Sequence, residues 1–357
     1  MTENLRQFSG WVHNLDPFIW QIYGQFGVRW YGLAYVGGFA VSYFIVNLLV
    51  KNKKNVLPSE LVIDFIFYGA LGTMIGGRIG YALFYKPELF VQWRSKLPYW
   101  DLLAVHEGGM ASHGGIIGIA IALAIFAYKL KKQNTNISFL HLWDLAVVSG
   151  GVGVFFGRLA NFINGELYGR PVQSAVAWAV KFPREILDWP AQAGTPIKSL
   201  SALVTQWGVS DAQWNSWVMT SDQRMYDYLF KIIDAIQEGN ESLRQGIEPL
   251  LLARHPSQLY AAFFEGIFLL VILLWLWRVP RKPGFLASSF LMLYAAGRIF
   301  DELFRMPDAD IGFQWLGLTR GQWLSVAMFI VGLGSFIWVQ KRNVPAIGGW
   351  WSRPDIS

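Results

Sequence analysis

Apolar residues in this chain gather in long runs that short, mostly basic segments separate. A helix needs about 20 mainly apolar residues to cross a hydrocarbon core of roughly 30 Å. Seven stretches approach or reach that length, at residues 30–50, 61–85, 114–130, 139–163, 257–278, 285–304 and 321–340. The pattern therefore predicts an all-α integral membrane protein with about seven transmembrane helices.

One connection is much longer than the others. Residues 165–256 separate the fourth and fifth runs, and within them residues 223–239 have the apolar spacing of an amphipathic helix. The segment also contains Trp178, Trp189, Trp207, Trp214 and Trp217. We expect an external subdomain here, inside one polytopic membrane domain of residues 1–357. An insertion that only stiffens the structure is the alternative.

Composition supports the membrane assignment. The chain is 54% hydrophobic and 15% charged, with a mean hydropathy of +0.32, whereas soluble domains carry about 25% charged residues. The absence of cysteine excludes disulfides, thiolate metal ligands and a nucleophilic cysteine of the chain's own. With five histidines and no close histidine pair, we expect no metal ion.

The positions of the basic residues predict the orientation. They follow the first, third, fifth and seventh runs, at Lys51, Lys53, Lys54, Lys129, Lys131, Lys132, Arg278, Arg281, Lys282, Lys341, Arg342 and Arg353. Cytoplasmic connections of membrane proteins carry such an excess. The N-terminus is therefore expected outside and the C-terminus in the cytoplasm. The net charge of +6 then indicates lipid headgroups as partners rather than nucleic acid.

Charged residues inside the runs are the candidates for function. A charge at mid-membrane costs at least about 2.5–3.5 kcal/mol, so it usually faces the protein interior. Arg78 lies among Gly72, Gly76 and Gly80, whose spacing is typical of a helix-packing face. A structural ion pair of Arg78 is the alternative to a role in binding. His113 precedes the pair Gly114 and Gly115 at the start of the third run, which suits a proton acceptor or an interfacial hydrogen bond.

The fourth and sixth runs end in polar residues. Arg158 and Asn161 are one turn apart if the fourth helix continues, and Glu166 follows them. In the sixth run, five residues fall on one helical face: Tyr294, Arg298, Asp301, Glu302 and Arg305. An intrahelical pair of Arg298 and Glu302 would explain part of this stripe. Together these residues predict an arginine-rich cavity near the outer leaflet, suited to an anionic headgroup.

The motifs together resemble the prolipoprotein diacylglyceryl transferase family of bacterial inner membranes. They are RWYGLAY (29–35), GGRIGYALFY (76–85), GGMASHGGIIG (108–118), GRLANFINGELYGR (157–170), RHPSQLY (254–260) and the stripe at 294–307. The resemblance covers about residues 28–340. Ala261 departs from it, because many members carry an acidic residue after the LY pair.

The resemblance implies a transferase that needs no cofactor. Such an enzyme moves the sn-1,2-diacylglyceryl group of phosphatidylglycerol to the lipobox cysteine that follows a prolipoprotein signal peptide, forming a thioether and releasing glycerol phosphate. It implies a multi-pass inner-membrane location, with the N-terminus and the external subdomain in the periplasm. The residues it marks in this chain are Tyr31, His113, Arg158, Asn161, Glu166, Gly169, Tyr294, Arg298 and Glu302.

The chemistry of this reaction predicts a role for several of these residues. His113 is expected to act as the base or to orient the thiol, and Arg158 and Arg298 to clamp the headgroup and the departing phosphate. Asn161 and Tyr31 would position groups by hydrogen bonds. The phosphatidylglycerol-binding set is predicted as Arg158, Arg298, Glu166, Gly169, Tyr294, Glu302 and Arg78. Glu166 and Glu302 would orient the arginines.

A transporter for an anionic solute is the strongest alternative, because it would use the same buried arginines. Such transporters often contain repeated halves, and no repeat is evident in this sequence. A structural scaffold is the other alternative.

Overall fold

The computed structural model describes residues 8–23, 26–51, 53, 56–95, 98–105, 108–192, 194–306 and 314–350. Lys54, Pro307 and Arg353 lie outside these residues. The chain divides into two compact units. The first unit comprises residues 1–35, 155–265 and 297–325, and the second comprises residues 36–154, 266–296 and 326–357.

Six helices among the described residues are long and apolar enough to cross a membrane. They are α1 (Trp30–Val50), α2 (Val62–Phe84, extended by a turn at Ser59–Leu61), α3 (Ser112–Lys132), α4 (Phe139–Ile163), the run Ser257–Trp277 and α12 (Arg320–Lys341). The predicted boundaries of α1 and α4 are confirmed at both ends. A further helix, α11 (Phe285–Asp301), has 17 residues and lies within the predicted run 285–304.

The run Ser257–Trp277 is not one regular α-helix. It begins as α9 (Ser257–Ala261), continues as a π-helical segment (Ala262–Phe268) and ends as α10 (Leu269–Trp277). Short π-helical segments inside α-helices occur frequently at functional sites. The irregularity lies where the run contains its one acidic residue, Glu265.

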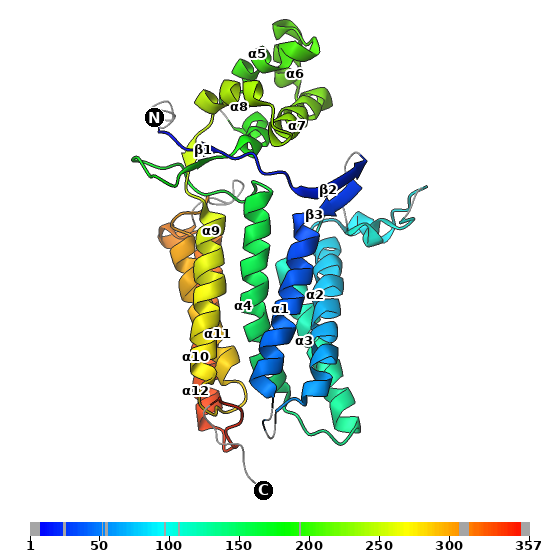
Figure 1. Ribbon diagram of the computed structural model, residues 1–357, viewed down its shortest axis with the longest axis vertical. Coiled ribbons are helices and arrows are strands. Elements are labelled where there is room, and N and C mark those ends of the chain that lie inside the picture. The colour runs from blue at the N-terminus through cyan, green and yellow to red at the C-terminus, as the bar shows by residue number, and fades with distance from the viewer. Residues whose placement is uncertain are drawn as a thin grey trace. The chain divides into compact units, whose positions relative to one another are not determined.

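In the second unit, α2 and α3 run side by side (Figure 1). Glycine permits this close approach, because a Cβ at Gly76 would lie 2.6 Å from the Cα of Gly118. A Cβ at Gly80 would lie equally close to the Cα of Gly114, at 2.6 Å. The predicted small-residue packing face is therefore confirmed.

The first unit contains short strands that the sequence analysis did not predict. β1 (Trp11–Val12) pairs in parallel with β4 (Val180–Lys181), which pairs in antiparallel with β5 (Ala253–Arg254). β2 (Phe18–Tyr23) and β3 (Phe26–Arg29) form an antiparallel hairpin just before α1. The two-residue strands β1, β4 and β5 have too few alternating positions to be recognised in sequence.

Four helices of the first unit share an apolar core. They are α5 (Ser201–Val204), α6 (Asp211–Thr220), α7 (Gln223–Gln237) and α8 (Glu241–Ile247), grouped in Figure 1. α7 confirms the amphipathic helix predicted at 223–239, and it buries Met225, Leu229, Ile232, Ile233 and Ile236. Side-chain caps fix three helix starts, at Ser210, Asp222 and Asn240.

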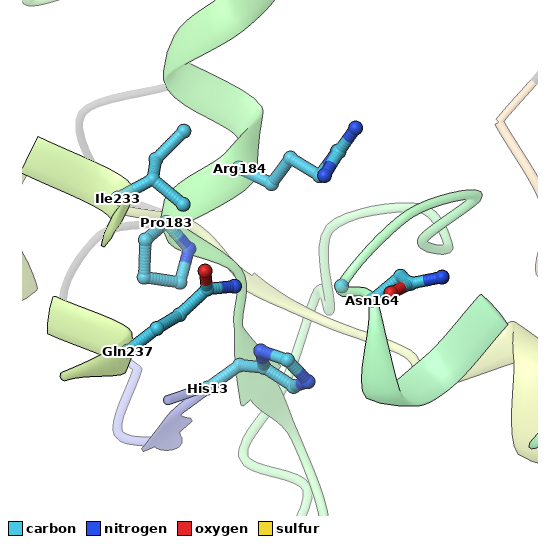
Figure 2. Close-up of a pocket in the computed structure, with 7 residues that line it drawn as sticks. His13, Asn164, Pro183, Arg184, Ile233 and Gln237 are labelled. Carbon is cyan, nitrogen blue, oxygen red and sulfur yellow. The ribbon is translucent and has the colours of Figure 1, made fainter. Parts of the chain in front are cut away.

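His13 connects the N-terminal strand to the end of α4. The imidazole Nε2 lies 2.7 Å from the Phe162 carbonyl oxygen, and the side chain is almost wholly buried. Figure 2 shows His13 at a small cavity of the first unit, lined by His13, Asn164, Gly165, Pro183, Arg184, Ile233 and Gln237. Burial lowers the pKa of His13 to about 4, so the folded protein holds this imidazole neutral.

Candidate functional site

Two of the predicted arginines contact the same buried carboxylate. Arg158 Nη2, from α4, lies 3.1 Å from Glu265 Oε2. Arg298 Nη1, from α11, lies 3.8 Å from the other oxygen, Glu265 Oε1. The Glu265 side chain is 0% exposed, and each arginine side chain is 16% exposed. The fold thus brings together residues that are 140 positions apart in sequence, Arg158 and Arg298.

Arg298 also contacts acids at the end of its own helix. Its Nη1 lies 3.0 Å from Asp301 Oδ2, and its Nη2 lies 2.8 Å from Glu302 Oε2. The predicted ion pair of Arg298 and Glu302 is therefore confirmed, with Glu302 one residue beyond the end of the helix. Glu302 Oε1 in turn accepts a hydrogen bond from the Thr319 hydroxyl at 2.8 Å.

The prediction that all five stripe residues share one helix is wrong at its C-terminal end, although Tyr294, Arg298 and Asp301 do lie on α11. α11 ends at Asp301, and Arg305 instead forms an isolated β-bridge with Gly169. The turn after Asp301 redirects the chain, so helical spacing no longer holds beyond it. Tyr294 belongs to the second unit, where its ring stacks on Phe290 at 5.5 Å.

Tyr31, Asn161 and Glu166 form a second polar cluster in the first unit. Asn161 Nδ2 donates to Glu166 Oε1 at 2.8 Å, and the Tyr31 hydroxyl donates to the same oxygen. Asn161 also donates to the Tyr31 hydroxyl. Gln258 Nε2 donates to the Glu166 carbonyl at 2.6 Å and so fixes the turn that follows α4. These contacts show Glu166 orienting Tyr31 and Asn161.

Gly169 serves a close approach of backbones. A Cβ at this position would lie 2.6 Å from the Phe304 carbonyl oxygen, so a larger residue would push the segments apart. The next residue reinforces the contact, because Arg170 Nε donates to the Arg305 carbonyl at 2.7 Å. A buried ion pair lies on the other side, where Arg254 Nε is 2.5 Å from Glu185 Oε2 and Arg254 Nη1 donates to the Gly169 carbonyl at 3.2 Å.

Arg78 and His113 belong to the second unit. Arg78 donates to the carbonyls of Asp101 and Leu102, at 2.7 and 2.8 Å, and to those of Gly108 and Gly109, at 2.6 and 3.1 Å. Bonds from all three guanidinium nitrogens to backbone favour a structural role over headgroup binding. His113 is an exposed residue in the first turn of α3, where its ring packs on Phe84 at 5.0 Å.

Glu265 is the site residue that sequence reasoning missed. It is the single carboxylate in the apolar run 257–278, and a lone acid in such a run is costly unless a cation compensates it. This free-energy cost is the signal by which the sequence could have identified Glu265 as a site residue. The helix that carries Glu265 starts at Ser257, which does not cap it, because the Ser257 hydroxyl donates to the Leu167 carbonyl at 3.1 Å.

Comparison with known proteins identifies the family. Residues 17–338 match the family described as prolipoprotein diacylglyceryl transferase. The chain belongs to this family. With six long apolar helices among the residues that the structure describes, it is a multi-pass bacterial membrane protein.

Curated relatives in this family are similar over nearly their whole length. A phosphatidylglycerol–prolipoprotein diacylglyceryl transferase of Bdellovibrio bacteriovorus is 50% identical over 346 residues, covering 95% of this chain and 97% of the relative. Relatives with the same name from Idiomarina loihiensis and Pseudoalteromonas translucida are 34% and 35% identical, each covering 92% of this chain and 94% of the relative.

Proposed function

We propose that this chain is a phosphatidylglycerol–prolipoprotein diacylglyceryl transferase. It transfers the sn-1,2-diacylglyceryl group to the lipobox cysteine thiol of a prolipoprotein, which is the first step of lipoprotein maturation. The observation that carries the proposal is the pair of arginines, Arg158 and Arg298, on one buried carboxylate in a chain of this family. Two guanidinium groups so placed suit one phosphate diester.

The reaction sets three requirements. A C–S bond forms at the glyceryl carbon while the bond from that carbon to a phosphate oxygen breaks. The thiol proton must leave, because a free cysteine has a pKa near 8.5 and the thiolate is the nucleophile. Glycerol phosphate departs with the bonding electrons, so its developing negative charge must be stabilised.

The arginines meet the third requirement. Arg158 and Arg298 bind the phosphate of phosphatidylglycerol and stabilise the charge on the leaving group through charge-assisted hydrogen bonds. Glu302 supports Arg298 through the 2.8 Å ion pair. Tyr31 and Asn161 position the substrate by hydrogen bonds, and Glu166 and Gly169 hold that part of the site in shape. We retain Tyr294, on α11, as a predicted member of the phosphatidylglycerol-binding set.

We assign the proton acceptor to His113. Its imidazole is exposed at the start of α3, and a neutral imidazole suits general-base catalysis near neutral pH. Arg78 supports the same unit through its four carbonyl bonds. Its contribution to binding phosphatidylglycerol would then be indirect.

The topology completes the proposal. We count α11 as the seventh span, place the N-terminus in the periplasm and the C-terminus in the cytoplasm of the inner membrane, and assign 165–256 to a periplasmic subdomain of one polytopic domain. Basic residues support this orientation, because they lie at the ends of α1, α3, α10 and α12. Among these basic residues, Lys282 also joins two segments of the second unit, because it donates to the carbonyls of Gln340 and Arg342 at 2.7 and 2.6 Å.

The test is a transfer assay with purified components. The protein is incubated with phosphatidylglycerol vesicles and a lipobox peptide, and the peptide mass and released glycerol phosphate are measured. We expect one diacylglyceryl thioether per peptide, and none on a peptide with serine in place of the lipobox cysteine. A wild-type protein that produces no thioether would refute the proposal; uptake of an anionic solute into vesicles would then favour the transporter.

A further inference from the structure

Glu265 is a fully buried carboxylate that belongs to no helix cap and to no surface ion pair. Its two oxygens divide between two cations: Oε2 is 3.1 Å from Arg158, and Oε1 is 3.8 Å from Arg298. These arginines come from α4 and α11, and Glu265 comes from the π-helical segment of a third span. One side chain thus connects three helical segments at the point where the phosphate is proposed to bind.

Burying the charged carboxylate of Glu265 costs free energy, which indicates that this charge has a specific role. Removing a carboxylate from water costs several kcal/mol, and nearby cations recover that cost only in good geometry. Arg298 already has acids of its own helix end at 3.0 and 2.8 Å, in Asp301 and Glu302. The positive charge of Arg298 is therefore already compensated without Glu265. Glu265 is needed to link Arg298 to Arg158, because its carboxylate contacts both guanidinium groups.

We infer that Glu265 is a positioning residue that holds the guanidinium groups of Arg158 and Arg298 at a fixed separation and orientation. Two like charges this close would otherwise repel each other and adopt separate rotamers. A shared carboxylate keeps both groups in place before the anionic substrate arrives. This role rests on the proposed function, since it is the phosphate of that reaction that the two arginines bind.

A fixed pair of arginines affects the transition state more than substrate binding. Long flexible side chains can still reach a phosphate when unanchored, so the ground state loses little. Charge on the leaving oxygen develops at one position, and a misplacement of about 1 Å from that position can cost about a hundredfold in rate. Loss of Glu265 should therefore lower kcat while KM for phosphatidylglycerol changes little.

Two substitutions separate charge from shape. Glu265→Gln keeps the size of the side chain and removes its charge, whereas Glu265→Asp keeps the charge on a shorter side chain. We expect E265Q to lower kcat at least tenfold with less than a threefold change in KM, and E265D to retain more activity than E265Q. If Glu265 only filled space, the order would be reversed, with the isosteric glutamine the milder change.

Asp144→Asn supplies a matched control. Asp144 is another buried acid of a membrane helix, 3% exposed, and it accepts hydrogen bonds from the backbone N–H groups of Gly284 and Ala287 at 2.7 and 2.8 Å. We expect D144N to lower the melting temperature and to leave kcat per folded molecule within twofold of wild type. Activity is normalised to folded protein in every variant.

The results separate the positioning role of Glu265 from the proposed transferase function. An active wild type together with an E265Q variant that keeps kcat within twofold would overturn the positioning role alone. The same conclusion would follow if E265Q outperformed E265D, or if the loss in E265Q matched its loss of folded protein. A wild type without transferase activity would remove the proposed function, and the positioning role with it.

Discussion

Glu185 Oε2 and Arg254 Nε lie 2.5 Å apart in the first unit, with side chains that are 1% and 7% exposed. The same carboxylate accepts the Leu252 backbone N–H at 3.1 Å, and the arginine donates to the Gly169 carbonyl. The pair thus joins a 3₁₀ turn at Pro183–Leu187 to β5 and to the segment after α4. It is a structural counterpart of the ion pairs around Glu265.

Glu185→Gln should destabilise the protein strongly. Breaking a buried pair leaves an uncompensated charge and typically costs about 3–5 kcal/mol, so we expect a clear fall in melting temperature. Arg224→Ala is the control, because Arg224 and its partner Asp222 form an exposed pair at 2.6 Å, and exposed pairs contribute little. Equal melting temperatures for E185Q and wild type would show that the pair is not needed for stability.

Arg158→Ala and Arg298→Ala should each abolish measurable transfer. Removing one charged donor that stabilises a transition state typically costs about a hundredfold to a thousandfold in kcat. Lysine in either position should recover only part of the rate, because it offers a single point of charge instead of a planar fork. The measurement is thioether formation by mass spectrometry. Near-normal modification by either alanine variant would contradict the phosphate clamp.

Arg244→Ala is the control for those variants. Arg244 lies on α8 and pairs with Glu241 at 2.5 Å at an exposed position, so it shares the charge change but not the site. We expect unchanged transfer and an unchanged melting temperature for this variant.

Asn161→Ala should reduce transfer without unfolding the protein. The substitution removes the Asn161 amide nitrogen, which donates hydrogen bonds to the Glu166 carboxylate at 2.8 Å and to the Tyr31 hydroxyl. Loss of one such hydrogen bond costs about 1–3 kcal/mol, which corresponds to a fall of about fivefold to 150-fold in kcat/KM. Initial rates at several phosphatidylglycerol concentrations provide the measurement. A kcat/KM within twofold of wild type would mean that the cluster is not part of the site.

His113→Gln should change the pH dependence of transfer. Without a base, the reaction depends on spontaneous ionisation of the substrate thiol, whose pKa is near 8.5. The rate of the variant should then rise about tenfold per pH unit between pH 6 and 8, while the wild-type rate varies less. Initial rates across this range decide the matter, and parallel profiles for the two proteins would exclude His113 as the base.

The spans were predictable because each depends on a local property of the sequence. Both ends of α1 and α4 follow from the limits of long, mainly apolar runs, and the contact of α2 with α3 follows from glycines at four-residue spacing. The predicted arginines likewise stood out, because a charge in an apolar run has few structural uses.

What could not be predicted depends on contacts between distant segments. Nothing local to Glu265 specifies a π-helical segment or indicates which arginines it meets, since Arg158 is 107 positions away. Helical spacing placed Arg305 on α11, but the β-bridge to Gly169 ends that helix earlier. Strands of two residues, such as β1 and β5, exist only through their partners.

His13 should make the docking of the N-terminal strand sensitive to acid. The folded protein depresses the pKa of this buried imidazole from an ordinary 6.5 to about 4. Its stabilising effect is therefore complete above pH 6.5 and is lost as the pH falls toward 4, by up to about 3 kcal/mol. Hydrogen exchange of the Trp11 and His13 amides, which donate to Ala179 and Lys181 at 3.2 and 2.8 Å, reports on this strand.

We expect these amides to lose protection between pH 7 and pH 4.5, after correction for intrinsic exchange. His13→Gln removes the titrating group while keeping a donor that can reach the Phe162 carbonyl, so its protection should vary much less with pH. The amide of Glu238, which directly follows α7 and donates to the Asp234 carbonyl at 2.8 Å, serves as an internal reference. If wild type and H13Q lost protection in parallel, the titration of another group would control the strand.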